Sequence, residues 1–317
     1  MRRSRRFFSS RQNILGVGLV IFFLFIAIAA PVLAPPEDPT SPSSFKVVGR
    51  VSDMQPHPPS ANAWLGTNSE QEDVFYTLVW GTRDALKFGL LVTIVTASSG
   101  ILFGAFSAYF GSLTNNLMMR LSDAFLAFPV IAGVVLFRQL LVILRNAAGI
   151  QIDFYGFANY TAGPAPPLLN FLTRLNPVMI ALVLLGWVSY ARLTNALVLQ
   201  LKGLDYVSAA RALGSGHSRL ILRHLLPNSL SPSMVLAARD LGSVVILQAT
   251  FTFIGLGGGS PWGELLSRGR DWIIGPGGNP FTYWWVYLPA TLALILFGLG
   301  WNMLGDGLND FINPRKH

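Results

Sequence analysis

The residue types that usually carry out chemistry are few in this chain and lie far apart. Its four histidines have no spacing typical of a metal site: His57, His217, His224 and His317. None of the lysines follows a glycine-rich phosphate loop of the form G-x-x-x-x-G-K-[ST], and no H-E-x-x-H sequence is present. Cysteine is absent, which excludes thiolate catalysis and cysteine-metal sites. The sequence therefore predicts a chain with no catalytic residue, no metal site and no cofactor of its own.

A glycine-containing segment, residues 205–228, combines helix-forming and turn-forming residues between two long apolar runs. Asp205 is expected to act as an N-cap, and residues 206–213 to form a short helix that Gly214 ends in a left-handed conformation. A second short helix is predicted to follow and to end at Pro227. Such a hairpin can bind another protein or lie on lipid headgroups as an amphipathic element, and the residues alone leave both interpretations open.

Two adjacent charges, Arg239 and Asp240, lie within an apolar run. A charge that faced lipid at a helix centre would cost about 2.5 to 3.5 kcal/mol, so both side chains should face protein or water. Because neighbouring residues on a helix point about 100° apart, the two are not expected to pair with each other. We predict that Arg239 and Asp240, with Gln248 about two turns farther along, line a cavity within the bundle. The alternative is that one side chain snorkels while the other pairs with a neighbouring helix.

The elements that must position these residues are six apolar runs, each long enough to cross about 30 Å of hydrocarbon. With 52% hydrophobic and 12% charged residues, the chain has too little polarity to cover a soluble protein of 317 residues. The predicted transmembrane helices are Ile14–Leu33, Phe88–Phe110, Leu117–Phe137, Val178–Leu199, Leu230–Ile254 and Trp284–Leu304. The sequence therefore predicts an all-α membrane protein in contact with lipid.

Basic residues are distributed unevenly between the two sides of this predicted bundle. If the N-terminus lies inside, the inner segments hold more than half of the basic residues and few of the acidic ones. The positive-inside rule then places both termini in the cytoplasm, and the net charge of +8 needs no nucleic-acid partner. The first apolar run exceeds the roughly 7 to 15 residues of a cleaved export signal, which favours an uncleaved anchor.

The chain is expected to have three parts along its length. Residues 1–87 contain the cytoplasmic N-terminus, the first helix and an outer loop, residues 88–306 form the transmembrane core, and residues 307–317 are a cytoplasmic tail. Two outer segments are longer than ordinary turns. Ala34–Leu86 is expected to form an ordered cap or loop without a core of its own, and Leu144–Pro177 to lie on the outer membrane surface.

A series of ordered motifs carries more specific information. The hairpin segment reads Tyr206-Val-x-Ala-Ala-Arg-Ala-Leu-Gly and then Arg219-x-Ile-Leu-Arg-His-x-Leu-Pro-Asn. It closely resembles the E-A-A signature of importer-type ABC permeases, in the form typical of the C-type permeases of dipeptide and oligopeptide transporters. Further motifs similar to that family extend over most of the chain: Leu65-Gly-Thr, Ala108-Tyr-Phe-Gly, Tyr190-Ala-Arg-Leu, Phe253-Ile-Gly-Leu-Gly and Leu304-Gly-Asp-Gly-Leu-Asn-Asp.

The resemblance implies a type I ABC importer permease fold in the cytoplasmic (inner) membrane and a non-catalytic role. Its expected partners are a second permease in a heterodimer, two ATPase subunits that bind the ATP, and an extracytoplasmic solute-binding protein. The cargo is expected to be a dipeptide or oligopeptide, with nickel or an oligosaccharide as alternatives because related permeases carry them. The hairpin would be the ATPase-docking loop, with these candidate docking residues: Asp205, Tyr206, Ala209, Ala210, Arg211, Gly214, Arg219, Arg223, Leu226 and Pro227.

Three positions depart from the family pattern. Ser208 replaces the usual glutamate of the signature, Glu72 stands where an arginine is expected, and Gln248 replaces a glutamate of the fifth span. These departures weaken the transfer of cargo identity but not of architecture.

Two other classes of membrane protein fit the sequence less well. An ion-coupled secondary transporter usually shows an inverted repeat or broken helices, and a membrane-embedded enzyme would place catalytic groups within its spans.

Overall fold

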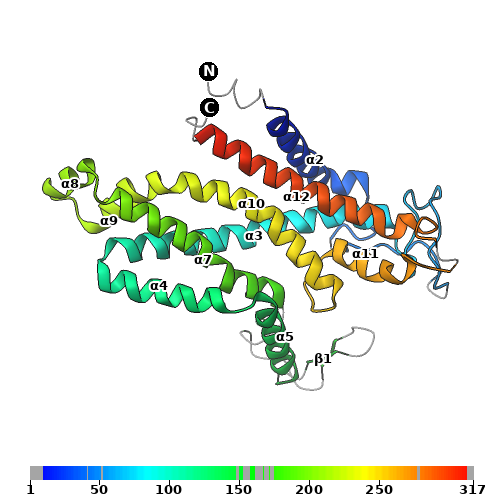
Figure 1. The fold of residues 1–317 in the computed structure, drawn as a ribbon. Coiled ribbons are helices and arrows are strands. Elements are labelled where there is room, and N and C mark those ends of the chain that lie inside the picture. The colour runs from blue at the N-terminus through cyan, green and yellow to red at the C-terminus, as the bar shows by residue number, and fades with distance from the viewer. Residues whose placement is uncertain are drawn as a thin grey trace.

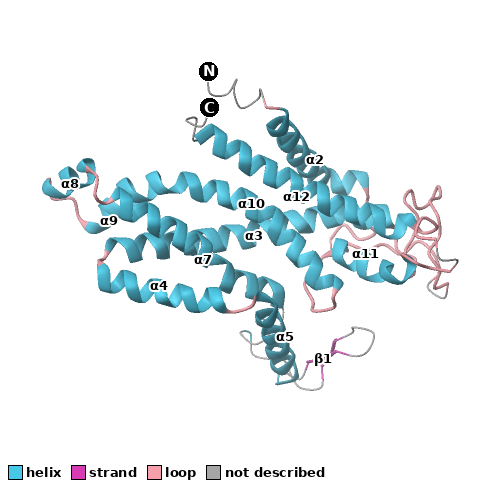
Figure 2. Ribbon diagram, in the orientation of Figure 1, coloured by secondary structure: helices cyan, strands magenta, loops and turns pink. Residues whose placement is uncertain are grey.

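The computed structural model describes residues 10–312, apart from residues 41, 51–52, 148–149, 153–157, 161–166, 168–170, 172–174 and 277–278. Most of the described chain is helical, and most of its long helices run lengthwise through the bundle, while α5 turns away from them (Figures 1 and 2). These helices are α2 (Arg11–Leu33), α3 (Val74–Tyr109), α4 (Ser112–Ala127), α5 (Val130–Ala147), α7 (Pro177–Leu201), α10 (Leu226–Phe253) and α12 (Trp284–Ile312). Two short strands after α5, β1 (Ile150–Ile152) and β2 (Ala158–Tyr160), form an antiparallel pair.

Five of these helices, α2, α3, α7, α10 and α12, are long and apolar enough to cross a membrane, α10 together with the turns before it. Helices α4 and α5 pass the same test only as a pair, and a bend of 82° separates them. The predicted helical membrane fold is therefore confirmed, but the third predicted span, Leu117–Phe137, is not a straight helix. The bend falls at Phe128, which is extended (φ −82°, ψ 123°) because Pro129 disfavours a helical conformation in the residue before it.

Helix α3 starts earlier than the sequence predicts, at Val74 rather than near Phe88. The Asp73 side chain caps this start by accepting hydrogen bonds from the backbone amides of Phe75 (2.8 Å) and Tyr76 (3.2 Å). The first turns of α3 therefore extend beyond the predicted apolar run.

The expected end of a helix at Pro227 is wrong. The short helix α9 (His217–Arg219), the π-helical segment η1 (Leu220–Leu225) and α10 form one continuous helix that ends at Phe253. Pro227 falls in the first turn of α10, where a missing backbone N–H costs little, and the wider turn of the π-helix precedes it.

Close packing of small and aromatic residues holds the bundle together. In α3, a side chain at Gly100 or Gly104 would collide with the backbone of Trp187 or Ala191 in α7, so the glycines allow these two helices to touch. A second contact region buries Phe23, with its ring centroid 5.2 Å from that of Phe297 in α12. These contacts fix the spacing between α3 and α7 and between α2 and α12.

Residues 34–73 form an ordered cap at the end of the bundle, whereas the rest of the segment predicted as a cap or loop, up to Leu86, is the start of α3 (Figure 2). The indole N–H of Trp80 donates to the carbonyl of Ala34 (2.9 Å), and that of Trp285 donates to the carbonyl of Thr67 (3.3 Å). The cap also contacts α11 (Pro261–Gly269), which continues into the 3-10 turn η2 (Arg270–Trp272). The other predicted outer segment, residues 144–177, lies largely outside the described residues.

Candidate functional site

The predicted hairpin projects at the end of the bundle opposite the cap (Figure 1). Its first helix is α8 (Asp205–Ala212), and Leu204, not Asp205, occupies the N-cap position, so Asp205 lies in the first helical turn. Gly214 has a left-handed backbone (φ 79°), which confirms the predicted stop. The turn is closed by the backbone amides of Gly214, which donates to Arg211 (3.0 Å), and Ser215, which donates to Ala210 (3.1 Å).

The inner side of the hairpin is fixed to the helix bundle by apolar contacts. Its buried side chains pack against the ends of α3 and α7 in one cluster: Val207, Leu220, Leu225 and Leu226 from the hairpin and its continuation, with Ala105, Ala108 and Val198. Two polar contacts add to this attachment. The Tyr109 hydroxyl lies 2.6 Å from Nδ1 of His217, and the Lys202 ammonium donates to the carbonyl of Ala108 (2.8 Å).

The side of the hairpin that faces away from the bundle is exposed and carries both apolar and basic residues. Leu213 at the tip is 87% exposed and Leu222 is 62% exposed. Of the predicted docking residues, those that are exposed are Asp205, Tyr206, Ala209, Arg211, Gly214, Arg219, Arg223 and Pro227. Ala210 is half-buried and Leu226 is buried, so these two belong to the packed side. Leu213 and Leu222 belong to the quoted motif but were not among the predicted docking residues, and their exposure is seen only in the structure.

The two transmembrane charges of α10 do not pair with each other, as the helical geometry predicts. Arg239 pairs with Asp306 of α12, and Asp240 faces the buried Tyr190 of α7. The Tyr190 hydroxyl has no hydrogen bond of normal geometry among the described residues. Arg239 therefore pairs with a neighbouring helix, as the alternative interpretation predicts. Asp240 has no ion pair among the described residues.

Gln248 is buried between α10 and the loop that follows this helix. Its side chain is buried, and its amide nitrogen donates to the carbonyl of Gly258 at 2.8 Å. Asn176, at the start of α7, donates to the same carbonyl at 2.6 Å. Gln248 thus helps to hold the loop between α10 and α11, and the structure does not bring it together with Arg239 and Asp240.

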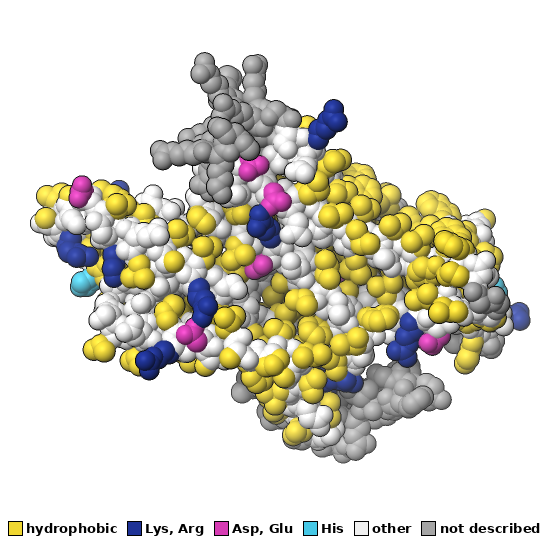
Figure 3. Space-filling view, in the orientation of Figure 1, with side chains coloured by type: hydrophobic (Ala, Val, Ile, Leu, Met, Phe, Trp, Pro, Cys, Tyr) yellow, Lys and Arg dark blue, Asp and Glu magenta, His cyan; other side chains and the backbone are white. Residues whose placement is uncertain are grey.

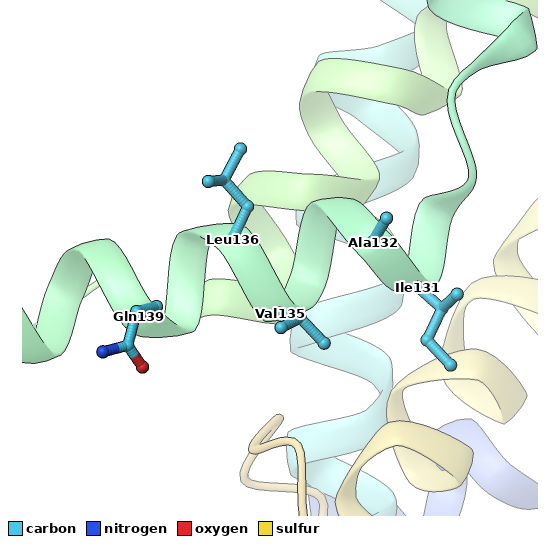
Figure 4. Close-up of a pocket in the computed structure, with 5 residues that line it drawn as sticks. All are labelled: Ile131, Ala132, Val135, Leu136 and Gln139. Atoms are coloured by element: carbon cyan, nitrogen blue, oxygen red, sulfur yellow. The ribbon is translucent and has the colours of Figure 1, made fainter.

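The bundle has a shallow hollow on α5 that is not a ligand site of the usual kind. Figure 4 shows the five side chains that line the hollow, which all lie on consecutive turns of α5: Ile131, Ala132, Val135, Leu136 and Gln139. A single helix cannot enclose a ligand, so this is an open apolar face. Within the described part of the chain, no three His, Asp or Glu side chains gather as a metal-binding group.

A bundle of helices long and apolar enough to cross a membrane, with a hairpin at one end, defines a multi-pass membrane protein. The chain belongs to the family of binding-protein-dependent transport system inner membrane components, which it matches over residues 100–317. It has the type I importer permease fold that the sequence motifs imply.

Relatives align along nearly the whole chain. A putative peptide transport system permease of Brucella suis is 31% identical, over 96% of this chain and 89% of the relative. A probable D,D-dipeptide transport system permease of Escherichia coli is 28% identical, over 94% and 85%. The oligopeptide transport system permease of Bacillus subtilis is 26% identical, over 98% and 88%.

Proposed function

We propose that this chain is a permease subunit of an ATP-driven peptide importer, and that the hairpin formed by α8 and α9 docks on a cytoplasmic ATPase subunit. The observation that carries the docking role is the two-sided construction of the hairpin. One side is buried against α3 and α7, while the other exposes Leu213, Leu222 and three arginines at the end of the bundle. An amphipathic element that lay on lipid would turn its apolar side chains toward the membrane, whereas Leu213 extends from the tip.

The hairpin is built to pass movement on to the helices. Because α9, η1 and α10 are continuous, a displacement of the hairpin acts directly on the helix that carries Arg239 and Asp240. The contact between Tyr109 and His217 links the same hairpin to the end of α3. Rigid elements that shift together are a common basis of such transitions.

The complete importer that we propose contains a second permease, two ATPase subunits and an extracytoplasmic solute-binding protein. This chain contributes no bond chemistry and no cofactor, since ATP is bound by the partner subunits. Both of its termini lie in the cytoplasm. Peptides are the proposed cargo because the relatives that align along the whole chain are named as peptide, dipeptide and oligopeptide permeases. Nickel and oligosaccharides remain the alternatives.

The test is reconstitution of the chain with its partner subunits in membrane vesicles. We expect the complex to co-purify with the ATPase subunits and to hydrolyse ATP faster when the binding protein is loaded with a peptide. Loading the binding protein with nickel or an oligosaccharide instead serves as the control for cargo class. A complex that assembles but responds to neither the binding protein nor the peptide would contradict the proposed function.

A further inference from the structure

A small cavity lies where the cap meets the end of α2 and the start of α3. Its volume is about 140 Å³, and we call it the cap cavity. Its lining includes Leu33 at the end of α2, Phe75 in the first turn of α3, and four residues of the cap: Pro35, Lys46, Trp64 and Asp73. The hairpin lies at the opposite end of the bundle, so its docking role does not involve these residues (Figure 1).

The cap cavity carries one positive and one negative side chain. The Lys46 ammonium has no ion-pair or hydrogen-bond partner among the described residues. Both capping hydrogen bonds of Asp73 end at its Oδ1, so Oδ2 is left without one in the described part of the chain. Burial raises the pKa of the Asp73 carboxyl, while its backbone hydrogen bonds and the nearby Lys46 ammonium oppose this rise. A partly desolvated carboxylate of this kind is stabilised by a further cation.

An aromatic pair forms another part of the lining. The ring centroid of Trp64 lies 5.1 Å from that of Phe75, and Trp64 is nevertheless 67% exposed. An exposed indole ring can bind an ammonium group through its π-electrons, and tryptophan is enriched where a protein meets the membrane surface. The cap cavity therefore offers Lys46 to an anion, and Asp73 with Trp64 to a cation.

The cap cavity adjoins the part of the chain that crosses the membrane. The 23 residues of α2 rise about 35 Å, close to the roughly 30 Å of hydrocarbon, so the end of this helix lies near the lipid headgroups. Toward its middle, α2 exposes Phe25, Ile28 and Val32, which recur at the spacing of one helical turn and form an apolar face. Figure 3 shows hydrophobic side chains gathered where α2 approaches the cap. An occupant of the cavity can therefore place an apolar tail along α2.

We propose that the cap cavity binds the headgroup of a phospholipid that carries a phosphate and a primary ammonium, as phosphatidylethanolamine does. Lys46 binds the phosphate, Asp73 and Trp64 bind the ammonium, and the acyl chains lie along the apolar face of α2. Phosphatidylglycerol has no cation for Asp73, and its phosphate is repelled by that carboxylate. Phosphatidylcholine has no N–H group to donate to it. This lipid site is separate from the transport of cargo and does not depend on it.

The test titrates the full-length chain, purified in detergent with the subunits that accompany it, with short-chain phospholipids. Native mass spectrometry measures the first bound lipid. Lys46→Gln removes the positive charge. Asp73→Asn removes the negative charge but keeps an oxygen at the N-cap of α3, where asparagine is about as effective as aspartate. Arg50→Gln is the matched control, because Arg50 is exposed in the same cap but does not line the cavity.

We expect the parent to bind phosphatidylethanolamine at least about tenfold more tightly than phosphatidylglycerol or phosphatidylcholine, because each lacks one charge-assisted hydrogen bond. Lys46→Gln should weaken the binding of phosphatidylethanolamine by about tenfold for the same reason. Asp73→Asn should weaken it by a similar factor without weakening the binding of phosphatidylglycerol. Arg50→Gln should stay within about a factor of two of the parent, since exposed charges contribute little.

Equal affinities of the parent for the three lipids, or equal losses in Lys46→Gln and Arg50→Gln, would show a general attraction of lipid to the cap and overturn the site. Free phosphoethanolamine, which has the headgroup without acyl chains, is titrated in parallel, and binding as tight as that of the lipid would assign the cavity to a soluble ligand instead. Parent-like lipid binding by Lys46→Gln, together with loss of ATP hydrolysis stimulated by the binding protein, would assign the cavity to a segment of that protein and refute the lipid site.

Discussion

Gly214 and Gly216 lie two residues apart in the same hairpin turn but have different backbones. Gly214 is left-handed (φ 79°), whereas Gly216 is extended (φ −67°, ψ 161°). No other group lies within 4 Å of the position that a Cβ atom would take at either glycine. A side chain therefore meets conformational strain at Gly214 and essentially none at Gly216.

This difference gives a matched pair of variants. Gly214→Val should cost about 1 to 2 kcal/mol in the left-handed conformation and lower the population of the docking-competent hairpin by about tenfold. ATP hydrolysis that depends on the binding protein should fall accordingly, as measured in reconstituted vesicles. Gly216→Val should stay close to the parent, because a β-branched residue is compatible with an extended backbone. Equal activity of both variants and the parent would refute the role of this turn in docking.

Helix geometry alone predicts the conformation or direction of some residues, but it does not predict contacts with residues that are distant in the sequence. The left-handed Gly214 and the divergence of Arg239 from Asp240 follow from helix geometry alone. The partner of Arg239 does not, because Asp306 lies 67 residues away in the sequence. Gln248 shows the same limit, since its position in α10 suggested a lining role while the loop that covers it could not be foreseen.

At the scale of helices, hydropathy located the spans and prolines decided where they break. Pro129 bends α4 away from α5, and hydropathy does not register this bend because apolar residues continue across it. Pro227 has the opposite outcome. It is accommodated at the start of α10, because the π-helical turn before it changes the backbone register, and a proline pattern alone does not predict that turn.

Helix α11 and the outer cap are joined by a cluster of three carboxylates around one guanidinium. Arg268 pairs with the buried Glu72 and lies 3.1 Å from Glu70 and 3.2 Å from Glu264. The Glu72 carboxylate also accepts a hydrogen bond from Asn68 (2.7 Å). The departure from the family pattern at Glu72 is thus matched by an arginine elsewhere in this chain.

Burial raises the pKa of the Glu264 carboxyl, and the positive charge of Arg268 opposes that rise. With a higher pKa in the folded protein, this group favours the native state when protonated. As the pH rises from the unfolded value of 4.5 through the folded pKa, the unfolded state releases its proton first and stability falls. The ionised group is therefore a source of instability at neutral pH.

Glu264→Gln should relieve this effect while keeping an oxygen that can accept a hydrogen bond from Arg268. We expect the midpoint of thermal unfolding of the purified complex to rise by about 2 to 4 °C at pH 7 to 8. The gain over the parent should disappear as the pH falls below 4.5. Glu70→Gln is the control that removes a carboxylate from the same arginine at a more exposed side chain, and it should give no such gain. A gain from Glu264→Gln that did not depend on pH would contradict the explanation by ionisation.

At the scale of the whole molecule, the sequence predicted which segments are helical in the membrane but not how the cap is assembled. Apolar length is a local property, and it identifies α2, α7 and α12 directly. The cap depends on contacts between distant segments, since Arg268 and Glu72 are 196 residues apart. The two ends of the bundle nevertheless differ plainly, with the cap at one and the hairpin at the other.

The orientation of these two ends in the membrane is the last prediction. The excess of basic residues in the segments predicted to be inner places the hairpin in the cytoplasm and the cap outside. Ser60 in the cap and Ser218 in the hairpin are both exposed, so a single cysteine at either position is accessible to a reagent on its own side. Ser260, at the same end of the bundle as the cap, is not suitable for cysteine labelling. It is buried, and its hydroxyl accepts a hydrogen bond from the Gly263 amide at the start of α11.

We expect Ser60→Cys to react with an impermeant thiol reagent in intact cells, where the cap faces the outside. Ser218→Cys should react only after the membrane is opened, and its labelling in opened cells shows that the thiol is reactive. The chain without any cysteine is the background control. Labelling of Ser218→Cys in intact cells, with Ser60→Cys protected, would place the hairpin outside. An external hairpin could not reach a cytoplasmic ATPase, so this result would refute the docking role while leaving the fold unchanged.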